Sequence, residues 1–175
     1  AYEINIEANY GRYIWDEVAL AGKPWNITPY GTESMHVLRA EKGYIIVGQD
    51  TDGSMTPMDV NMKWILAKDK PFSYIGRRSF SISALNSDDR FQLVGLLTKD
   101  AHVVLPEGSH IINNKGGSIG YVTSSYFSPI LRRSIAMAQL KGGLSKMTEI
   151  VLVKIVQEKQ GLKEIPCEVS SSVFY

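Results

Sequence analysis

Residues 110–124, HIINNKGGSIGYVTS, contain two short runs rich in β-branched residues on either side of a glycine-containing turn. His110 to Asn113 and Ile119 to Ser124 have the composition of β-strands. Between them, Asn114-Lys115-Gly116-Gly117 is typical of a hairpin turn, because Asn and Gly tolerate the positive φ angles that such turns need. The stretch therefore predicts a β-hairpin and, with it, an antiparallel sheet.

Three further runs of similar composition lie on either side of this hairpin. Phe91 to Leu97 precedes it, and Ser134 to Leu140 and Glu149 to Val156 follow it. Clusters of Gly, Pro, Asn or Ser separate the runs. Several short strands at close spacing are typical of a small barrel or sandwich, so we expect an antiparallel β-barrel domain over residues 88–175.

The first part of the chain has a different periodicity. Apolar and polar residues alternate from Tyr2 to Glu7, which predicts a half-buried strand. Asn9 is a suitable N-cap for a helix whose apolar residues then recur at helical spacing. Gly22 and Pro24 are expected to end that helix.

A second helix is predicted to begin near Thr32 and to stop at Gly43, a favourable residue at a helix C-terminus. Tyr44 to Val47 predicts a short strand, and Trp64 to Ala67 is compatible with another. The turn-rich stretch from Asp50 to Asp59 between them predicts a loop that leads into one helical turn.

These elements predict an α+β chain with two domains. Residues 1–70 would be the rear part of an α+β unit, residues 71–87 a linker or helix, and residues 88–175 the barrel. The best boundary lies within Lys68 to Arg78, where a proline and a glycine interrupt a charged stretch.

Composition excludes several classes of protein. The net charge of +1 gives no electrostatic argument for binding nucleic acid or an anionic membrane. No apolar run approaches the length of a membrane span, and Ala1 to Ile6 does not resemble a signal peptide. We therefore expect a cytoplasmic chain. Because it also lacks an initiator Met, we expect it to be part of a larger subunit. Cys167 is the sole cysteine, so an internal disulfide is excluded.

The residue types that usually carry catalysis are sparse. His36, His102 and His110 have no spacing that resembles a metal site, so no metal ligand is predicted, and His36 is expected to be a helix-surface or packing residue. No Gly-x-Ser-x-Gly motif is present. Gly116 to Gly120 predicts a hairpin turn and not a nucleotide site, because no helix is expected after it.

Glu3 is a carboxylate flanked by apolar residues in the predicted first strand. A single carboxylate can accept two parallel hydrogen bonds from an amidine-like N–H edge of a ligand ring. The alternative is that Glu3 faces solvent on the polar side of that strand. The pattern alone favours this second interpretation.

Two motifs in different halves of the chain point to one superfamily. Leu38-Arg39-Ala40-Glu41 resembles the Leu-Arg-x-Glu helix of the glycine-cleavage T-protein (aminomethyltransferase) superfamily. Residues 119–131, IGYVTSSYFSPIL, resemble its Gly-x-Val-Thr-Ser-x-x-x-Ser-Pro-x-Leu signature. Within that superfamily, the sequence of residues 32–43, TESMHVLRAEKG, is most similar to that of the alpha subunits of heterotetrameric sarcosine oxidases. The resemblance covers essentially the whole chain.

This resemblance implies a tetrahydrofolate-binding module. Ala1-Tyr2-Glu3-Ile4 matches the end of a family motif whose second acid, here Glu3, holds the pterin. Tyr44 matches an aromatic residue beside the ligand, and Tyr175 lies in the closing segment, where an aromatic residue approaches folate. The family's catalytic Asp has no counterpart here, so no catalytic residue is predicted. The chain alone is expected to be inactive.

In the implied enzyme, sarcosine is oxidised at a flavin on another subunit, and the one-carbon unit leaves this module as 5,10-methylenetetrahydrofolate. Flavin and NAD are expected elsewhere in the parent complex, with the other sarcosine oxidase subunits as partners. The chain has two basic pairs, Arg77-Arg78 and Arg132-Arg133. We expect them to lie in solvent-exposed turns, because Arg is mostly exposed in proteins. The alternative is that they contact another subunit or another part of the parent chain.

One position departs from the T-proteins. They carry an Arg-Asp pair four residues before the motif arginine, and that first Arg is expected to contact folate, whereas Met35 stands here. The departure favours sarcosine oxidase alpha over a free T-protein. A T-protein, a dimethylglycine-oxidising relative, a non-enzymatic folate-binding scaffold and a barrel used only for subunit contacts remain as alternatives.

Overall fold

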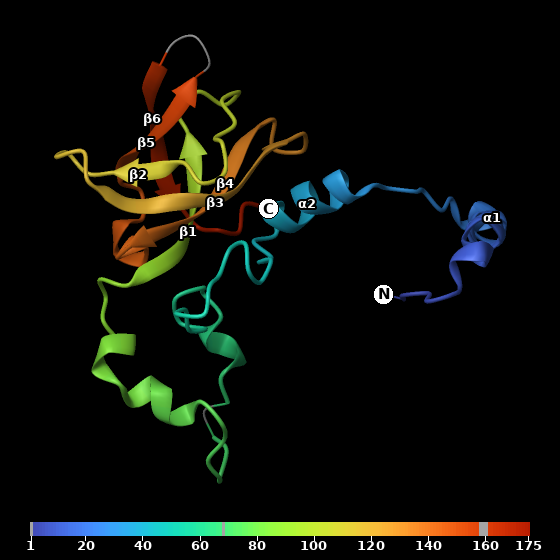
Figure 1. Ribbon diagram of the computed structural model, residues 1–175, viewed down its shortest axis with the longest axis horizontal. Helices are drawn as coiled ribbons and strands as arrows, with labels where there is room; N and C mark the ends of the chain where they lie inside the picture. The colour runs from blue at the N-terminus through green and yellow to red at the C-terminus, as the bar shows by residue number, and fades with distance from the viewer. Residues whose placement is uncertain (1, 68, 158–160) are drawn as a thin grey trace. The chain divides into compact units, whose positions relative to one another are not determined.

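The computed structural model describes residues 2–67, 69–157 and 161–175 (Figure 1). The chain divides into two compact units, Ala1–Ser34 and Met35–Tyr175, and each is described by itself. The second unit contains a closed six-stranded barrel, which confirms the predicted barrel and excludes the open sandwich.

The first unit is built around helix α1, Gly11–Gly22, which follows a short 3-10 turn over Ala8–Tyr10. The helix ends at the predicted glycine, but Asn9 is not its cap: Tyr10 occupies the N-cap position without a capping side-chain bond. Residues 2–7 form no strand, so that prediction is wrong. A strand needs a partner for its backbone hydrogen bonds, and none of the described strands pairs with this segment.

Helix α2, Thr32–Glu41, ends as the sequence predicts. Gly43 has a φ of +69°, and its N–H donates to the carbonyl of Ala40 at 3.0 Å. The N–H of Tyr44 donates to the carbonyl of Arg39 at 2.8 Å. These two bonds form a Schellman motif, which fixes the direction in which the chain leaves the helix.

The barrel is entirely antiparallel, with its strands in the order β1-β4-β3-β2-β5-β6. Its strands are β1 Phe91–Thr98, β2 His110–Ile112, β3 Ser118–Ser128, β4 Arg133–Lys141, β5 Ile150–Gln157 and β6 Gly161–Ser170. The five predicted strand runs correspond to β1 to β5. The hairpin predicted at Asn114 to Gly117 joins β2 to β3.

Strand β6 is not among the strand runs predicted from the sequence. Pro166 lies in its interior, and proline cannot donate to a strand ladder. Pro166 instead stands opposite Leu152 of β5, and its carbonyl accepts a 3.0 Å bond from the N–H of Lys99 beyond the end of β1. This strand pairs with both β1 and β5 and closes the barrel. Closure therefore depends on a segment whose local sequence argues against a strand.

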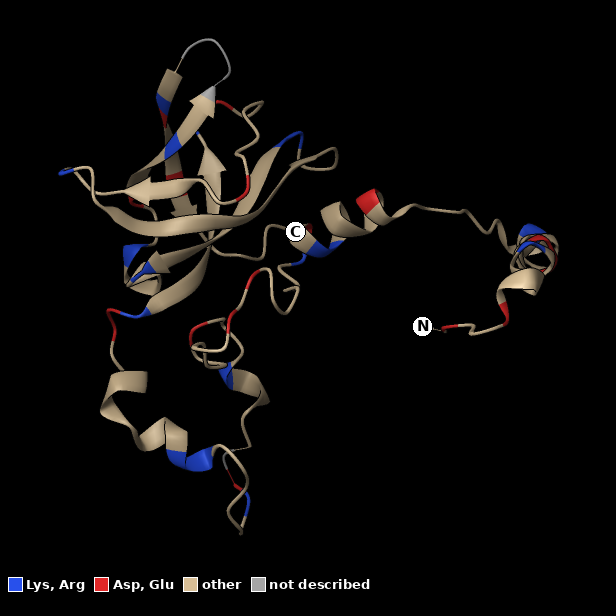
Figure 2. Cartoon of the chain, viewed as in Figure 1, with Lys and Arg blue, Asp and Glu red and all other residues tan. Residues whose placement is uncertain are grey.

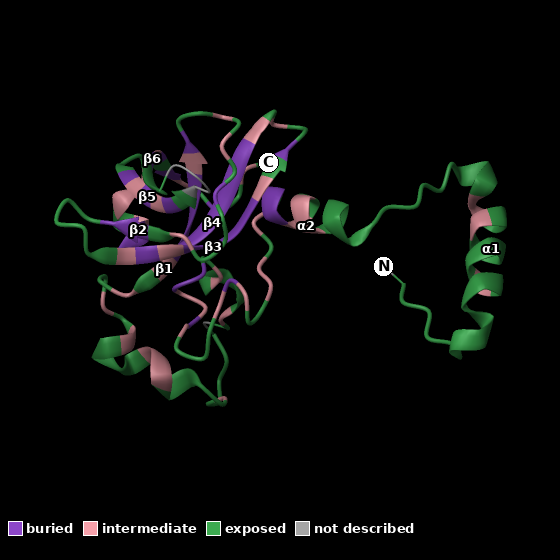
Figure 3. Ribbon diagram, turned by 45° about the horizontal axis from the view of Figure 1, so that its top comes forward, coloured by how far each residue is buried: buried purple, intermediate pink, exposed green. Residues whose placement is uncertain are grey.

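Two buried apolar clusters support this unit. The first fills the barrel and includes Leu96, Ile111 and Val153. The second joins Ala40 of α2 to Leu93 and other residues on the barrel's outer side. Figure 3 shows the burial concentrated in the strands and at the end of α2, while α1 is largely exposed.

The segment between α2 and the barrel lacks the two predicted strands. Val47 makes only an isolated bridge to Thr51, and Lys63–Ile65 is a 3-10 turn. Two more 3-10 turns, Arg77–Ser81 and Ser83–Leu85, lie in the predicted linker. The domain boundary at residues 71–87 stays a prediction. Acidic and basic residues are interspersed along these loops (Figure 2), and no helix in the described part of the chain is long and apolar enough to span a membrane.

Candidate functional site

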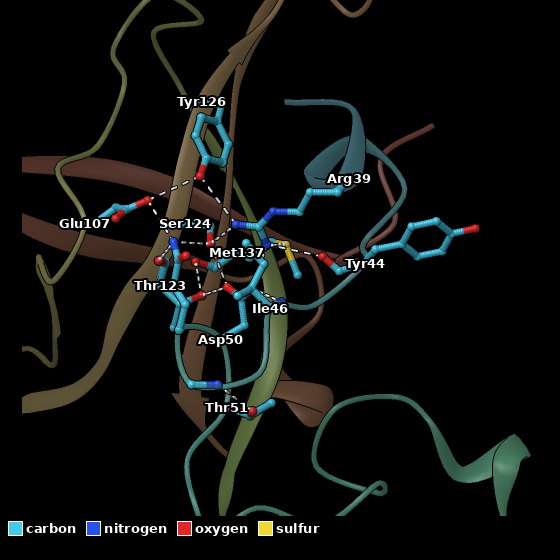
Figure 4. A network of polar contacts seen from close by, with 12 residues as sticks. Arg39, Tyr44, Ile46, Asp50, Thr51, Glu107, Thr123, Ser124, Tyr126 and Met137 are labelled. Carbon is cyan, nitrogen blue, oxygen red and sulfur yellow. Dashed lines mark hydrogen bonds and ion pairs between the residues drawn. The ribbon is translucent and has the colours of Figure 1, made fainter. Parts of the chain in front are cut away.

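The Arg39 guanidinium lies at the centre of a buried polar network between α2 and the barrel (Figure 4). Its Nη1 lies 2.6 Å from Oδ2 of Asp50 and donates to the carbonyl of Tyr44 at 3.2 Å. Its Nη2 donates to Oγ of Ser124 at 2.7 Å. Because the Arg39 side chain is 9% exposed and that of Asp50 fully buried, each charge depends on the other for compensation.

Both carboxylate oxygens of Asp50 are hydrogen-bonded. Oδ2 accepts the backbone N–H of Ile46 at 2.8 Å as well as Arg39. Oδ1 accepts the hydroxyls of Thr123 at 2.5 Å and Ser124 at 2.7 Å. These four donors match the roughly four acceptor sites of a carboxylate. Asp50 therefore joins α2, the following loop and strand β3.

A β-bulge in β3 allows two consecutive hydroxyls to reach the same carboxylate. Successive side chains of a regular strand point to opposite faces. Here the register between β3 and β4 shifts between Val122 and Ser124, which leaves Thr123 as the extra residue. The bulge turns Thr123 and Ser124 toward Asp50 together, which a regular strand would not do.

Glu41, the last residue of the helix motif, makes a second link to the barrel. Its carboxylate accepts a 2.5 Å hydrogen bond from the hydroxyl of Ser128. The Ser128 oxygen in turn accepts the N–H of Leu131 at 3.0 Å. The carbonyl of Glu41 accepts the N–H groups of Phe174 and Tyr175 at 2.9 and 3.0 Å. The end of α2 thus holds both the β3–β4 turn and the C-terminal segment.

A third buried carboxylate, Asp59, secures the loop before the barrel. Arg90 lies 2.8 Å from it through Nη2, and both the N–H and hydroxyl of Thr56 donate to it. Burial by itself raises the pKa of Asp59, but the hydrogen bonds from Arg90 and Thr56 outweigh it and hold that pKa below its ordinary value. The hydrogen bond between Arg90 and Asp59 in turn raises the pKa of Arg90.

Two of the three predicted folate contacts are attached to the same helix end. Tyr44 follows the Schellman turn and is 68% exposed. Tyr175 is 64% exposed, and Nζ of Lys42 lies 4.7 Å from the centre of its ring. The backbone of each residue is hydrogen-bonded to α2, Tyr44 to Arg39 and Tyr175 to Glu41. Two aromatic rings are therefore accessible on a rigid support.

Glu3 lies in the first unit, in an exposed segment without regular structure. Its carboxylate accepts a 3.2 Å bond from Nδ2 of Asn5. The expectation that it projects from a strand is therefore wrong. Its role toward a ligand stays a prediction.

The structure also places His36 and Met35, which are neighbours in α2. The ring of His36 stacks on Tyr126 at 6.3 Å between centres, so it is a packing residue. Met35 is 44% exposed and supplies no hydrogen-bond donor at the position where the T-protein pattern is expected to have Arg. The sequence did not reveal the roles of Asp50, Thr123 and Ser124, although Thr123 and Ser124 lie within the barrel signature at residues 119–131.

The motifs of the two halves are therefore in contact, and comparison with known proteins names the family that shares them. Residues 1–70 match the family model of the GCVT N-terminal domain, and residues 92–175 match that of the glycine cleavage T-protein C-terminal barrel domain. The chain belongs to the glycine cleavage T-protein family. In this member of the family, the helix motif and the barrel signature join the two matched regions through Arg39 and Glu41.

Similar proteins include both branches expected from the sequence. The alpha subunit of sarcosine oxidase from Corynebacterium sp. (strain P-1) is 46% identical over 160 residues, which are 86% of this chain and 16% of that protein. The corresponding subunit from Rhizobium meliloti (strain 1021) is 35% identical, with coverage of 87% and 16%. An aminomethyltransferase from Synechococcus sp. (strain CC9311) is 30% identical, with coverage of 99% and 44%.

A solved structure shares the fold. The glycine cleavage system aminomethyltransferase T from Bartonella henselae superposes with a TM-score of 0.76 at 26% identity, covering 93% of this chain and 44% of that one. The chain spans 16%, 16% and 44% of the length of the three curated relatives named above, which is less than half of each.

Proposed function

We propose that this chain is the folate-binding portion of a sarcosine oxidase alpha subunit. The observation that carries the proposal is the 46% identity to such a subunit over 160 residues, against 30% to an aminomethyltransferase. The parent enzyme would oxidise sarcosine at a flavin held elsewhere, with NAD also bound outside this chain. The module would help to form 5,10-methylenetetrahydrofolate from the one-carbon unit released.

The chemistry of the exposed residues suits tetrahydrofolate. Tyr44 and Tyr175 present accessible rings that can pack beside a flat heterocycle. The exposed carboxylate of Glu3 can accept the paired N–H groups of a pterin edge. Bound tetrahydrofolate would supply the nucleophilic nitrogen that takes up the one-carbon unit.

The residues of this chain would bind and orient the cofactor. The Schellman turn and the bonds to Glu41 hold the backbones of Tyr44 and Tyr175 before any ligand arrives. Such preorganisation lowers the entropy lost on binding. We assign no catalytic residue to the chain, and expect the other sarcosine oxidase subunits to be its partners.

Calorimetric titration of the parent subunit with tetrahydrofolate tests this proposal. Tyr44→Ala and Tyr175→Ala should each weaken binding, whereas Tyr74→Ala serves as a matched control because Tyr74 packs against Lys70 and Arg77. The proposal fails if the subunit does not bind tetrahydrofolate, or if all three variants bind it as tightly as the unchanged subunit.

A free aminomethyltransferase is the second candidate, favoured by the relative that aligns over 99% of this chain. Met35 argues against it, because a thioether cannot replace the hydrogen bonds of the expected Arg. Sarcosine-dependent flavin reduction by the purified parent protein would support the first candidate. A parent protein without flavin that transfers an aminomethyl group would support the second.

A further inference from the structure

A small cavity beside the closing end of the barrel has the composition of a ligand site. It has a volume of about 220 Å³ and is lined by Leu97, Leu131, Arg133, Ser170, Ser171, Val173 and Phe174. These residues come from the end of β1, the β3–β4 turn, the start of β4, the end of β6 and the segment that follows β6. We propose that this cavity binds a small organic monocarboxylate with a short apolar tail, with Arg133 as its cationic anchor.

The charge of Arg133 is uncompensated among the described residues. Its Nη2 donates to the carbonyl of Thr98 at 3.0 Å, which fixes the side chain, but no described carboxylate lies within ion-pair distance. Its Nε is buried and finds no acceptor in the described part of the chain. A partly buried guanidinium is ordinarily paired with an anion, so this position favours a negatively charged ligand.

The hydroxyl of Ser171 adds a second polar contact. Its oxygen accepts the N–H of Val173 at 3.1 Å, and its own hydrogen, which has no acceptor among the described residues, can donate to a ligand. The neighbouring Ser170 hydroxyl already donates to the carbonyl of Ser171 at 3.1 Å. One guanidinium and one hydroxyl suit the two oxygens of a carboxylate better than the more highly charged phosphate group, which needs more donors.

The remaining walls determine the rest of the ligand. Leu97, Leu131, Val173 and Phe174 present apolar surface to the cavity. The volume is below the range of about 300–1,000 Å³ typical of sites for drug-sized ligands, which favours a small molecule. A branched aliphatic acid of amino-acid size fits both requirements. This site does not depend on the folate role.

Isothermal titration of the 175-residue chain tests the proposal with 3-methylbutanoate and its uncharged isostere, 3-methylbutanamide, in the absence of folate. We expect the acid to bind at least tenfold more tightly than the amide. Arg133→Met should abolish this preference, and Ser171→Ala should weaken binding of the acid several-fold. Arg132→Met is the matched control, because Arg132 is the exposed neighbour outside the cavity lining, and it should keep the preference.

Circular dichroism would verify folding of each variant. If Arg133→Met does not fold, Arg133→Gln replaces it, since an amide can still donate to Thr98 without carrying a charge. Equal binding of acid and amide to the unchanged chain would overturn the proposal. It would also be overturned if Arg132→Met lost the preference for the acid as completely as Arg133→Met. Folate titration is a separate measurement, so the two proposals fail independently.

Discussion

Ser128 donates a 2.5 Å hydrogen bond to the buried carboxylate of Glu41, which lies 87 residues earlier in the sequence. The bond joins the last residue of the Leu-Arg-x-Glu helix to the serine of the barrel's Ser-Pro signature. Together with the bond between Arg39 and Ser124, it shows that these family motifs hold the barrel against α2. Their contacts in this chain are structural.

Removing this link should destabilise the second unit. Ser128→Ala would leave the buried Glu41 carboxylate without that donor, and we expect a loss of about 1–3 kcal/mol in the free energy of unfolding. Urea denaturation followed by fluorescence would measure it. Glu33→Gln, at the exposed start of the same helix, is the control and should change stability by less than about 0.5 kcal/mol.

Asp50→Asn should be more damaging. The substitution leaves the buried Arg39 charge uncompensated. It also replaces one acceptor oxygen by an NH2 donor, so either the two hydroxyls on Oδ1 or the Arg39 and Ile46 N–H groups on Oδ2 lose their acceptor. A loss of about 3–5 kcal/mol is therefore expected. Asp52→Asn changes an exposed carboxylate in the same loop and should have a much smaller effect. Similar unfolding free energies for the two variants would contradict the role assigned to the network.

Asp59 should make stability depend on pH in the acid range. Because its pKa is lower in the folded chain than in the unfolded one, its contribution is fully present above its unfolded value, about 3.9. The contribution is lost as pH falls through the lower folded pKa. The difference in unfolding free energy between the unchanged chain and Asp59→Asn should therefore shrink below about pH 4. A difference that stays constant from pH 6 to pH 3 would refute this linkage.

Cys167 should be unreactive while the barrel is closed. It is fully buried in β6, and burial raises the pKa of its thiol to about 12, so very little thiolate exists at pH 8. We expect a disulfide reagent to label it only after unfolding in urea. A cysteine placed at the exposed hairpin residue Lys115 provides the comparison and should react immediately. Equally rapid labelling of Cys167 would show that β6 does not close the barrel.

Glu3 tests the proposed folate role in the parent subunit. Glu3→Gln should weaken tetrahydrofolate binding by about 1–3 kcal/mol, because a charge-assisted bond to the pterin edge would be lost. Sarcosine should still reduce the flavin, since that reaction would occur elsewhere. Calorimetry and stopped-flow flavin reduction measure the two effects. Unchanged folate affinity would show that Glu3 is a solvent-exposed residue without that function.

The chain alone provides a further test. We expect it to convert no one-carbon donor into 5,10-methylenetetrahydrofolate, because the resemblance gives the family's catalytic Asp no counterpart among these residues. The reaction would be followed by chromatography of the folate products, with the parent subunit as the positive control. Turnover by the chain at a rate comparable to the parent's would place the missing catalytic group within these residues.

Local sequence determined several elements of this protein correctly. The hairpin at Asn114 to Gly117, the strand runs from β1 to β5 and the stop of α2 at Gly43 all follow from short-range preferences. Motifs in both halves also indicated the family. These features depend on residues close together in the chain, where periodicity and turn chemistry are sufficient.

Tertiary structure decided the rest. Alternation at residues 2–7 predicted a strand that has no described partner, whereas β6 forms around Pro166 because β1 and β5 supply its pairing. The bulge at Thr123 brings two consecutive hydroxyls to Asp50, 73 and 74 residues away in the chain. Periodicity describes a segment by itself, but strand pairing and buried charge compensation belong to pairs of distant segments. Their partners and register are therefore set only when the barrel closes.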